Sequence, residues 1–185
     1  TAEIDEIKVG YGATPVEWLF NTHEVDDRWC LIHSTHLTDI ETRSIAKSKA
    51  IVGLCPITES SLGDGIFNGV IFSKEKGAYG FGTDSNIQID LRAEMRTFEY
   101  SQRLKHKARA VLATETKSTG RILHEQANKS SATALGRNSG KIAIGYLADI
   151  AELPLGNPDL EGLKNDMALD AWIFSPDSTS VENLW

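Results

Sequence analysis

The sequence has little cysteine, no long apolar run and no excess of positive charge, and each shortage excludes a class of protein. Its two cysteines, Cys30 and Cys55, form neither a disulfide framework nor a C-x-x-C metal motif. Both lie in apolar runs, so we expect reduced residues of the core. No apolar run approaches the ~20 residues that span a bilayer, and no signal peptide is visible. These features lead us to expect a cytoplasmic protein.

Basic residues are outnumbered, with 19 Lys and Arg against 26 Asp and Glu and a net charge of −7. Because no basic tract is present either, the sequence argues against nucleic acid and against an anionic membrane surface as partners. The hydrophobic content of 41% and the length of 185 residues are ordinary for a globular chain. They allow one domain with a well-formed core, or one domain with a small appendage.

The middle of the chain alternates between apolar strand-like runs and helical patterns. A capping box at Thr38 and Glu41 opens one helix, and a long helical pattern runs from about Asp90 to about 113. Such alternation predicts a parallel sheet with right-handed crossovers. The apolar runs are continuous, which is typical of strands buried on both faces, and they cover residues 29–32, 50–54 and 78–82.

After residue 136 the pattern changes to short apolar stretches between turns. We expect short strands at 140–145, 148–150 and 170–174, and the last five residues resemble the start of another strand.

Polar side chains collect just after the three apolar runs. His33 and His36 follow the first, Thr58 and Glu59 follow the second, and Asp84 follows the third. In a barrel of parallel strands these ends converge on one pocket, whereas in an open sheet they line a crevice. The sequence has no G-x-G-x-x-G and no P-loop, so a nucleotide crevice has no support.

An aspartate and a histidine at neighbouring strand ends suit metal-assisted hydrolysis. A divalent ion lowers the pKa of water to about 7, a carboxylate such as Asp84 can take its proton, and a histidine such as His33 can orient it. Two such residues do not complete a site, because a catalytic zinc has about three protein ligands. The run of Asp84, Ser85 and Asn86 is also compatible with ordinary turn or helix-cap chemistry.

Three strand-end segments together resemble the sixth, seventh and eighth barrel strands of the amidohydrolase superfamily. Their sequences are most similar to those of the N-formimino-L-glutamate deiminases (formimidoylglutamate deiminases), and the resemblance covers nearly the whole chain. The segments are RWCLIHSTHLT (28–38), VGLCPITE (52–59) with LGDGIF (62–67), and GTDSN (82–86) with the helical sequence that follows it at 91–104.

The resemblance implies an α/β fold that forms the C-terminal half of a metal-dependent hydrolase. Residues 1–136 would supply the last three strands and their helices of a (β/α)8 barrel of the TIM type, and 137–185 part of a small β-rich domain. Asp84 matches the aspartate that contacts a single Zn²⁺ and acts as base, and His33 matches the histidine that hydrogen-bonds nucleophile and substrate. The other zinc ligands of the family lie outside this sequence.

The implied activity is zinc-dependent deimination of N-formimino-L-glutamate, a small-molecule substrate, to N-formyl-L-glutamate and ammonia in histidine degradation. A homodimer of the full-length protein is the implied assembly. We expect Glu59 either to bind the amidine end of the substrate at the pocket rim or to stabilise a loop. Ser85 and Asn86 are candidates for orienting the metal ligand. Alternatives are a guanine-, cytosine- or adenosine-type deaminase, and a catalytically incomplete half-barrel that serves as a binding or assembly module.

Overall fold

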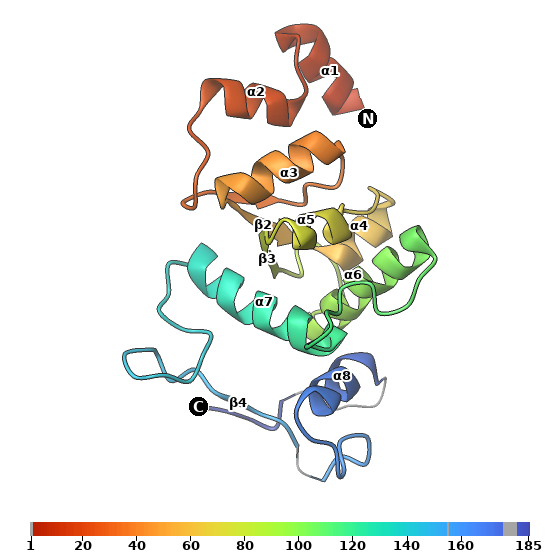
Figure 1. The fold of residues 1–185 in the computed structure, drawn as a ribbon, viewed down its shortest axis with the longest axis vertical. Helices are drawn as coiled ribbons and strands as arrows, with labels where there is room; N and C mark the ends of the chain where they lie inside the picture. Colours follow the sequence, from red (N-terminus) through yellow and green to blue (C-terminus); the bar gives the residue numbers. More distant parts are fainter. Residues whose placement is uncertain (1, 155, 176–180) are drawn as a thin grey trace.

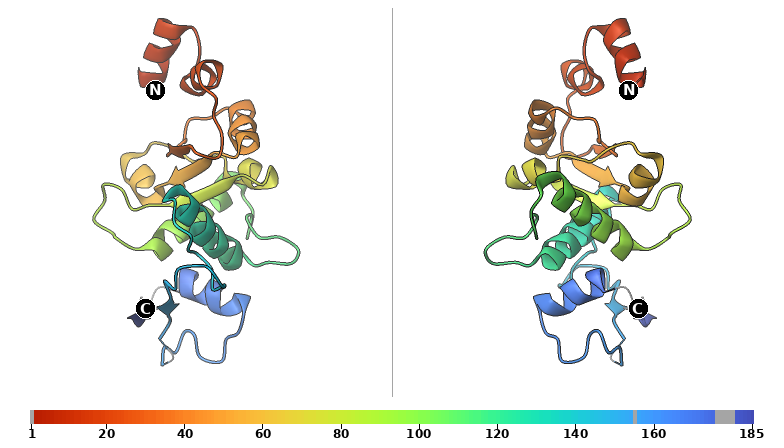
Figure 2. Two further views of the ribbon diagram at one scale, coloured as in Figure 1. Left: turned by 90° about the vertical axis from the view of Figure 1, so that its left-hand side faces the viewer. Right: turned by 90° about the vertical axis from the view of Figure 1, so that its right-hand side faces the viewer.

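The computed structural model describes residues 2–154, 156–175 and 181–185. A three-stranded parallel sheet lies at the centre with helices around it, and Figures 1 and 2 place α1 and α2 at the opposite end of the molecule from α8 and β4. In chain order the elements are α1 (Ala2–Tyr11), α2 (Pro15–Thr22), β1 (Cys30–Ile32), α3 (Asp39–Ser48), β2 (Ile51–Leu54), α4 (Pro56–Leu62), α5 (Gly69–Lys74), β3 (Ala78–Phe81), α6 (Leu91–His106), α7 (Thr119–Ala134), β4 (Ala151–Glu152), α8 (Asp166–Phe174) and β5 (Asn183–Leu184).

The sheet has the order β1-β2-β3, and both strand pairs are parallel. Strands and helices alternate as the sequence predicted. The expectation that every strand is buried on both faces holds for β2 but is wrong for β1, where Ile32 is 57% exposed. Because β1 lies at the edge of the sheet and has one neighbouring strand, Cys30 is also exposed, against the prediction. Cys55 is buried as predicted, and both thiols are free.

Local capping decides where the helices begin. Thr38 accepts a hydrogen bond from the Glu41 amide at 3.2 Å, and the Glu41 carboxylate accepts one from the Thr38 amide at 2.8 Å, so the predicted capping box is confirmed. Asp90 caps α6 by accepting from the Arg92 amide at 2.9 Å. That helix ends earlier than predicted, because Lys107 adopts a left-handed conformation with φ of 51°.

An aromatic cluster joins the sheet to the helices on one of its faces. Tyr79 of β3 is fully buried, and its ring centroid lies 5.3 Å from that of Phe98 on α6. Phe67 and Phe72, from the segment between β2 and β3, pack edge-on at 5.2 Å in the same cluster. Burying four aromatic rings contributes a large share of the apolar area that holds α6 against the sheet.

The region after α7 differs from the sequence-based expectation. Residues 140–145 and 148–150 form no strand, and 170–174 belong to α8. This helix packs against α6 and α7 and buries Trp172 and Ile173. A short apolar run can be a strand or a buried helix segment, and its periodicity does not distinguish them. The strand expected at the end of the chain is present as β5, which pairs antiparallel with β4.

Among the residues that the structure describes, no helix combines the length and the apolar character needed to cross a membrane.

Candidate active site at the strand ends

The carboxyl ends of the three parallel strands bring His33, Cys55 and Asp84 together. Sheet hydrogen bonding continues just past β1, where the His33 amide donates to the Gly53 carbonyl at 2.8 Å. Cys55 follows β2 directly, and Asp84 lies shortly beyond β3. The sheet thus fixes the backbone below each side chain, which is how parallel α/β folds position their sites.

The predicted pair of His33 and Asp84 lies side by side. Nε2 of His33 is 3.7 Å from Oδ2 of Asp84, and the two side chains are 41% and 35% exposed. Ligand-type atoms of His33, Cys55 and Asp84 all lie within 4.8 Å of one another. Nitrogen, sulfur and carboxylate oxygen are all donors that zinc accepts. The donor set therefore fits part of a zinc site.

Cys55 is a metal-ligand type that the sequence interpretation placed only in the core. Burial, together with the nearby carboxylates, raises the pKa of its thiol to about 12. A metal binds the thiolate form of cysteine, so Cys55 would have to lose this proton to become a ligand.

The backbone is left-handed at both ends of the site. His33 has φ of 64°, Ser34 has 54° and Asp84 has 44°. Non-glycine residues rarely adopt this conformation, and it costs roughly 1–3 kcal/mol each where the surroundings enforce it. Three of the eight non-glycine residues with positive φ in the described part of the chain lie at these two strand ends. Backbone strain at a functional site can set the direction of a side chain.

Glu59 lies against His33 and is buried. It belongs to α4, so the expected loop is a helix, and only 5% of the residue is exposed. Its Oε1 accepts from the Cys55 amide at 3.0 Å and faces Nδ1 of His33 at 3.4 Å. Burial raises the pKa of its carboxyl, while the Cys55 amide and His33 oppose that rise. The structure thus places Glu59 against His33 and not in open space for a substrate.

Asn86 ties the Asp84 loop to its surroundings. Its amide nitrogen donates to the Thr58 hydroxyl at 3.3 Å and to the Thr83 carbonyl. The Thr58 hydroxyl in turn donates to the Thr83 carbonyl at 3.2 Å. The Ser85 hydroxyl donates to Oδ1 of Asp84 at 3.3 Å. Both predicted orienting residues therefore lie next to Asp84, and Asn86 connects its loop to α4.

Glu94 is a further buried carboxylate at the same place, and sequence inspection missed it. It is fully buried, accepts from the Ile57 amide at 2.9 Å and lies 3.4 Å from the amide nitrogen of Asn86. Burial raises the pKa of its carboxyl. The only local signal was an acidic residue in the first turn of a helix, which is common without any role in a site.

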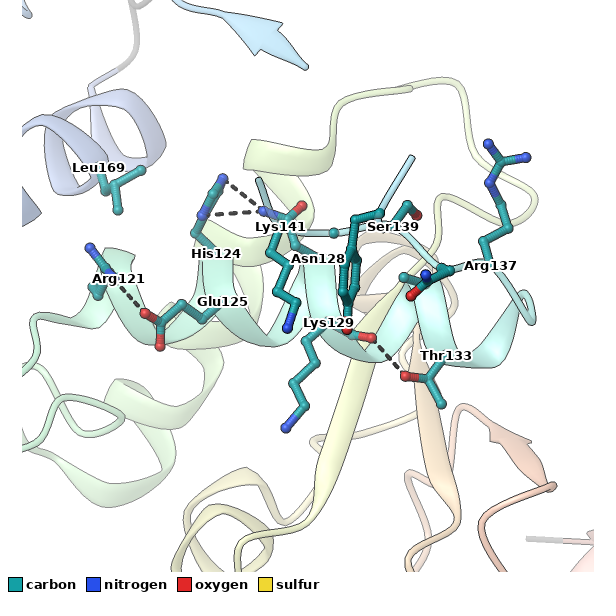
Figure 3. Close-up of a pocket in the computed structure, with 14 residues that line it drawn as sticks. Arg121, His124, Glu125, Asn128, Lys129, Thr133, Arg137, Ser139, Lys141 and Leu169 are labelled. Atoms are coloured by element: carbon teal, nitrogen blue, oxygen red, sulfur yellow. Dashed lines mark hydrogen bonds and ion pairs between the residues drawn. The ribbon is translucent and has the colours of Figure 1, made fainter. Parts of the chain in front are cut away.

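A separate cavity of about 600 Å³ lies along α7 and the segment that follows it (Figure 3). None of the predicted site residues lines it. Several of its polar groups bond to each other, since Arg121 pairs with Glu125 at 2.5 Å and Asn128 donates to His124 at 3.1 Å. This cavity is therefore separate from the chemistry at the strand ends.

Comparison with known proteins identifies the protein family to which this chain belongs. Residues 1–176 match the Amidohydrolase family. The chain belongs to this family. The resemblance seen in the strand-end motifs is therefore confirmed at the level of the superfamily.

Two curated amidohydrolase relatives match almost the entire chain. Formimidoylglutamate deiminase of Pseudomonas aeruginosa is 36% identical over 98% of this chain and 40% of the relative. A 5-methylthioadenosine/S-adenosylhomocysteine deaminase of Pyrococcus abyssi is 30% identical over 97% of this chain and 42% of the relative. The chain spans about two fifths of the length of these amidohydrolases.

Solved amidohydrolase structures have the same arrangement of elements. An amidohydrolase from Brucella melitensis superposes with a TM-score of 0.92 at 44% identity, over 100% of this chain and 40% of the other. An adenosine deaminase from Xanthomonas campestris with bound zinc gives 0.87 at 23% identity, over 100% of this chain and 42% of the other. The predicted fold class, an α/β structure that forms part of a (β/α)8 barrel, is confirmed.

Proposed function

We propose that the polypeptide to which these residues belong is a zinc-dependent hydrolase of a C–N bond. Its substrate would be N-formimino-L-glutamate, and its products N-formyl-L-glutamate and ammonia. The observation that carries the proposal is the pair of His33 and Asp84, with Nε2 and Oδ2 3.7 Å apart at the ends of β1 and β3. The 36% identity to a formimidoylglutamate deiminase supports the choice of substrate.

Asp84 would hold a single zinc ion together with ligands that lie outside this chain. When bound, zinc would supply Lewis acidity that lowers the pKa of a water molecule to about 7. Asp84 accepts one proton of the attacking water as a new C–O bond forms at the formimino carbon. The same carboxyl passes that proton to the formimino nitrogen. As the C–N bond breaks, the remaining hydroxyl proton also moves to this nitrogen by way of the carboxyl, so that ammonia leaves and the formyl C=O forms.

His33 would contact the same attacking water molecule as Asp84. Its Nε2 lies 3.7 Å from Oδ2 of Asp84, so a water molecule bound beside Asp84 can also hydrogen-bond to the ring. That hydrogen bond orients the nucleophile. Ser85 and Asn86 hold Asp84 in place for these proton transfers, through the contacts described above.

The proposal extends to the setting of the whole protein, a cytoplasmic homodimer that acts in histidine degradation. It includes a boundary near residue 136, with residues 1–136 in the barrel and 137–185 in a small β-rich unit. The end of α7 at Ala134 and the antiparallel pairing of β4 with β5 support that boundary.

Ammonia release from N-formimino-L-glutamate by the zinc-loaded, full-length gene product tests the activity. Guanine, cytosine and adenosine serve as comparison substrates. We expect release from the formimino compound alone. Release from none of the four by the zinc-loaded protein would contradict the proposal, and a full-length protein that binds no zinc would favour the catalytically incomplete half-barrel.

A nucleoside- or nucleobase-type deaminase is the second candidate. The 30% identity to a 5-methylthioadenosine/S-adenosylhomocysteine deaminase favours it, and the strand-end chemistry would be the same. Ammonia release from adenosine, guanine or cytosine, without release from N-formimino-L-glutamate, would select this alternative.

A further inference from the structure

We propose that Glu59 is a positioning residue for His33. Its carboxylate accepts the proton on Nδ1 of the ring, which leaves Nε2 as a hydrogen-bond acceptor directed at Asp84. The proposal rests on the proposed function in that it concerns the same strand-end site. It is an alternative to the two roles that the sequence suggested for Glu59, binding the substrate and stabilising a loop.

The two carboxylates lie at opposite nitrogens of one imidazole ring. Oε1 of Glu59 is 3.4 Å from Nδ1 of His33, and Oδ2 of Asp84 is 3.7 Å from Nε2. A neutral imidazole carries one proton, and the nitrogen that bears it is set by the hydrogen bond made by the other. Of the two, only the Glu59 carboxylate lies within hydrogen-bond distance of the ring, so it is the carboxylate that selects the tautomer. In that tautomer the free lone pair is on Nε2, the side on which water must be activated.

Glu59 is fixed in this role by its own surroundings. The Cys55 amide donates to Oε1 at 3.0 Å, so the carboxylate is anchored to the end of β2. The residue is 5% exposed, and a substrate could reach it only by displacing neighbouring side chains. A buried carboxylate is costly unless it is hydrogen-bonded, and the Cys55 amide and the His33 ring are the partners that the structure gives it.

The backbone at His33 gives independent support. His33 and Ser34 have φ of 64° and 54°, a left-handed turn directly after β1. This turn sends the chain away from the sheet while the ring stays between Glu59 and Asp84. Strain of this kind persists only where the surrounding structure enforces it.

The first test needs no substrate and no substitution at Glu59. Zinc-loaded, full-length protein with ¹⁵N-labelled histidine is studied by NMR at about pH 8.5, where free histidine, with a pKa of about 6.5, is neutral. The His33 signals are assigned by their absence in the His33→Gln protein. We expect the proton on Nδ1 and none on Nε2. A proton on Nε2 with a bare Nδ1 would overturn the proposal.

The second test separates positioning from substrate binding by kinetics. Glu59→Gln keeps the shape but can present an amide N–H to Nδ1, which reverses the tautomer. We expect kcat to fall by about 10–100-fold with KM nearly unchanged. The control is Glu41→Gln, a second glutamate that is 5% exposed but is bonded to Thr38 and Thr14. It should keep the wild-type kcat.

A rise in KM alone would show that Glu59 grips substrate, and an unchanged kcat would show that it does not position His33. Either result would overturn the proposal. If N-formimino-L-glutamate is no substrate, kcat is measured on the comparison substrate that releases ammonia. The proposed function then fails while the NMR result still decides the role of Glu59. If Glu59→Gln does not fold, the wild-type tautomer alone decides it.

Discussion

Asp84 combines two properties that are rarely found together at an ordinary turn residue. Its backbone is left-handed, with φ of 44°, and its carboxylate faces the ring of a histidine from another strand end. The helix cap that was the alternative interpretation is supplied by Asp90 instead. A residue held in a costly conformation and not used as a cap is free to act in chemistry.

We expect Asp84→Asn to lower kcat for ammonia release by at least about 100-fold, because an amide cannot accept the proton of the attacking water. The far-UV circular dichroism spectrum should stay unchanged, since the side chain is partly exposed. The control is Asp39→Asn, an exposed residue in the first turn of α3. Near-normal turnover by the Asp84 variant would remove this residue from the mechanism.

Asn86→Ala tests whether the loop contacts orient Asp84. Loss of the bonds to Thr58 and Thr83 frees the loop, and changes to such supporting residues typically cost about 10–100-fold in activity or metal affinity. Zinc content and kcat of the full-length protein are the measurements. Gln88→Ala, an exposed residue of the same loop, is the control. If the two variants behave alike, Asn86 does not orient the ligand.

Among the elements, α7 depends on a close approach to β3. An ideal Cβ built on Gly80 would lie 2.6 Å from the Ser131 hydroxyl and 3.3 Å from its backbone nitrogen. Only a residue without a side chain allows α7 to pack this closely on the strand. The packing of α7 then supports α8, whose Trp172 and Ile173 are buried in the core.

Gly80→Ala should therefore lower the free energy of unfolding by about 1–3 kcal/mol, the typical cost of overpacking a core. Urea unfolding of the full-length protein measures it. Gly10→Ala is the matched control, because a Cβ there meets nothing within 4 Å. In the last turn of α1 that change should be neutral or should stabilise by up to about 1 kcal/mol. The same change in the free energy of unfolding for both variants would contradict the packing argument.

At the scale of the whole molecule, several acidic groups lie close together near the carboxyl ends of the central strands. Glu59 and Glu94 are 5% and 0% exposed, and Asp84 lies in the same region. Burial raises the pKa of the carboxyls of both glutamates. The fold therefore carries an electrostatic cost at neutral pH, which the Cys55 and Ile57 amides offset in part.

This cost predicts how stability changes with pH. The pKa of Glu94 is raised above its ordinary value of 4.5, so the folded state binds this proton more tightly than the unfolded state. The resulting stabilisation is complete below about pH 4.5 and is lost as pH rises through the higher folded value. Glu94→Gln cannot ionise and should flatten this decline, as measured by urea midpoints over a pH series. The control is the exposed Glu115→Gln, and parallel curves for Glu94→Gln and the wild type would contradict the prediction.

The sequence by itself determined the features that depend on neighbouring residues. Capping at Thr38, the apolar runs of the three strands and the placement of His33 and Asp84 just after their strands are all local. Because parallel strands must end at one edge, this local information already indicated that the two side chains meet. The strand expected at 170–174 failed for the same reason, since a local pattern does not say what an apolar run packs against.

Only the tertiary structure decided which groups support that pair. Ile57 and Glu94 are 37 residues apart in the chain, and His33 and Glu59 are 26 residues apart. No local sequence pattern therefore predicts either contact. The exposure of Cys30 likewise follows from the position of β1 at the sheet edge. Burial and hydrogen-bond partners are properties of the packed molecule, and they place Glu59 against His33, a neighbour that the local sequence around Glu59 does not indicate.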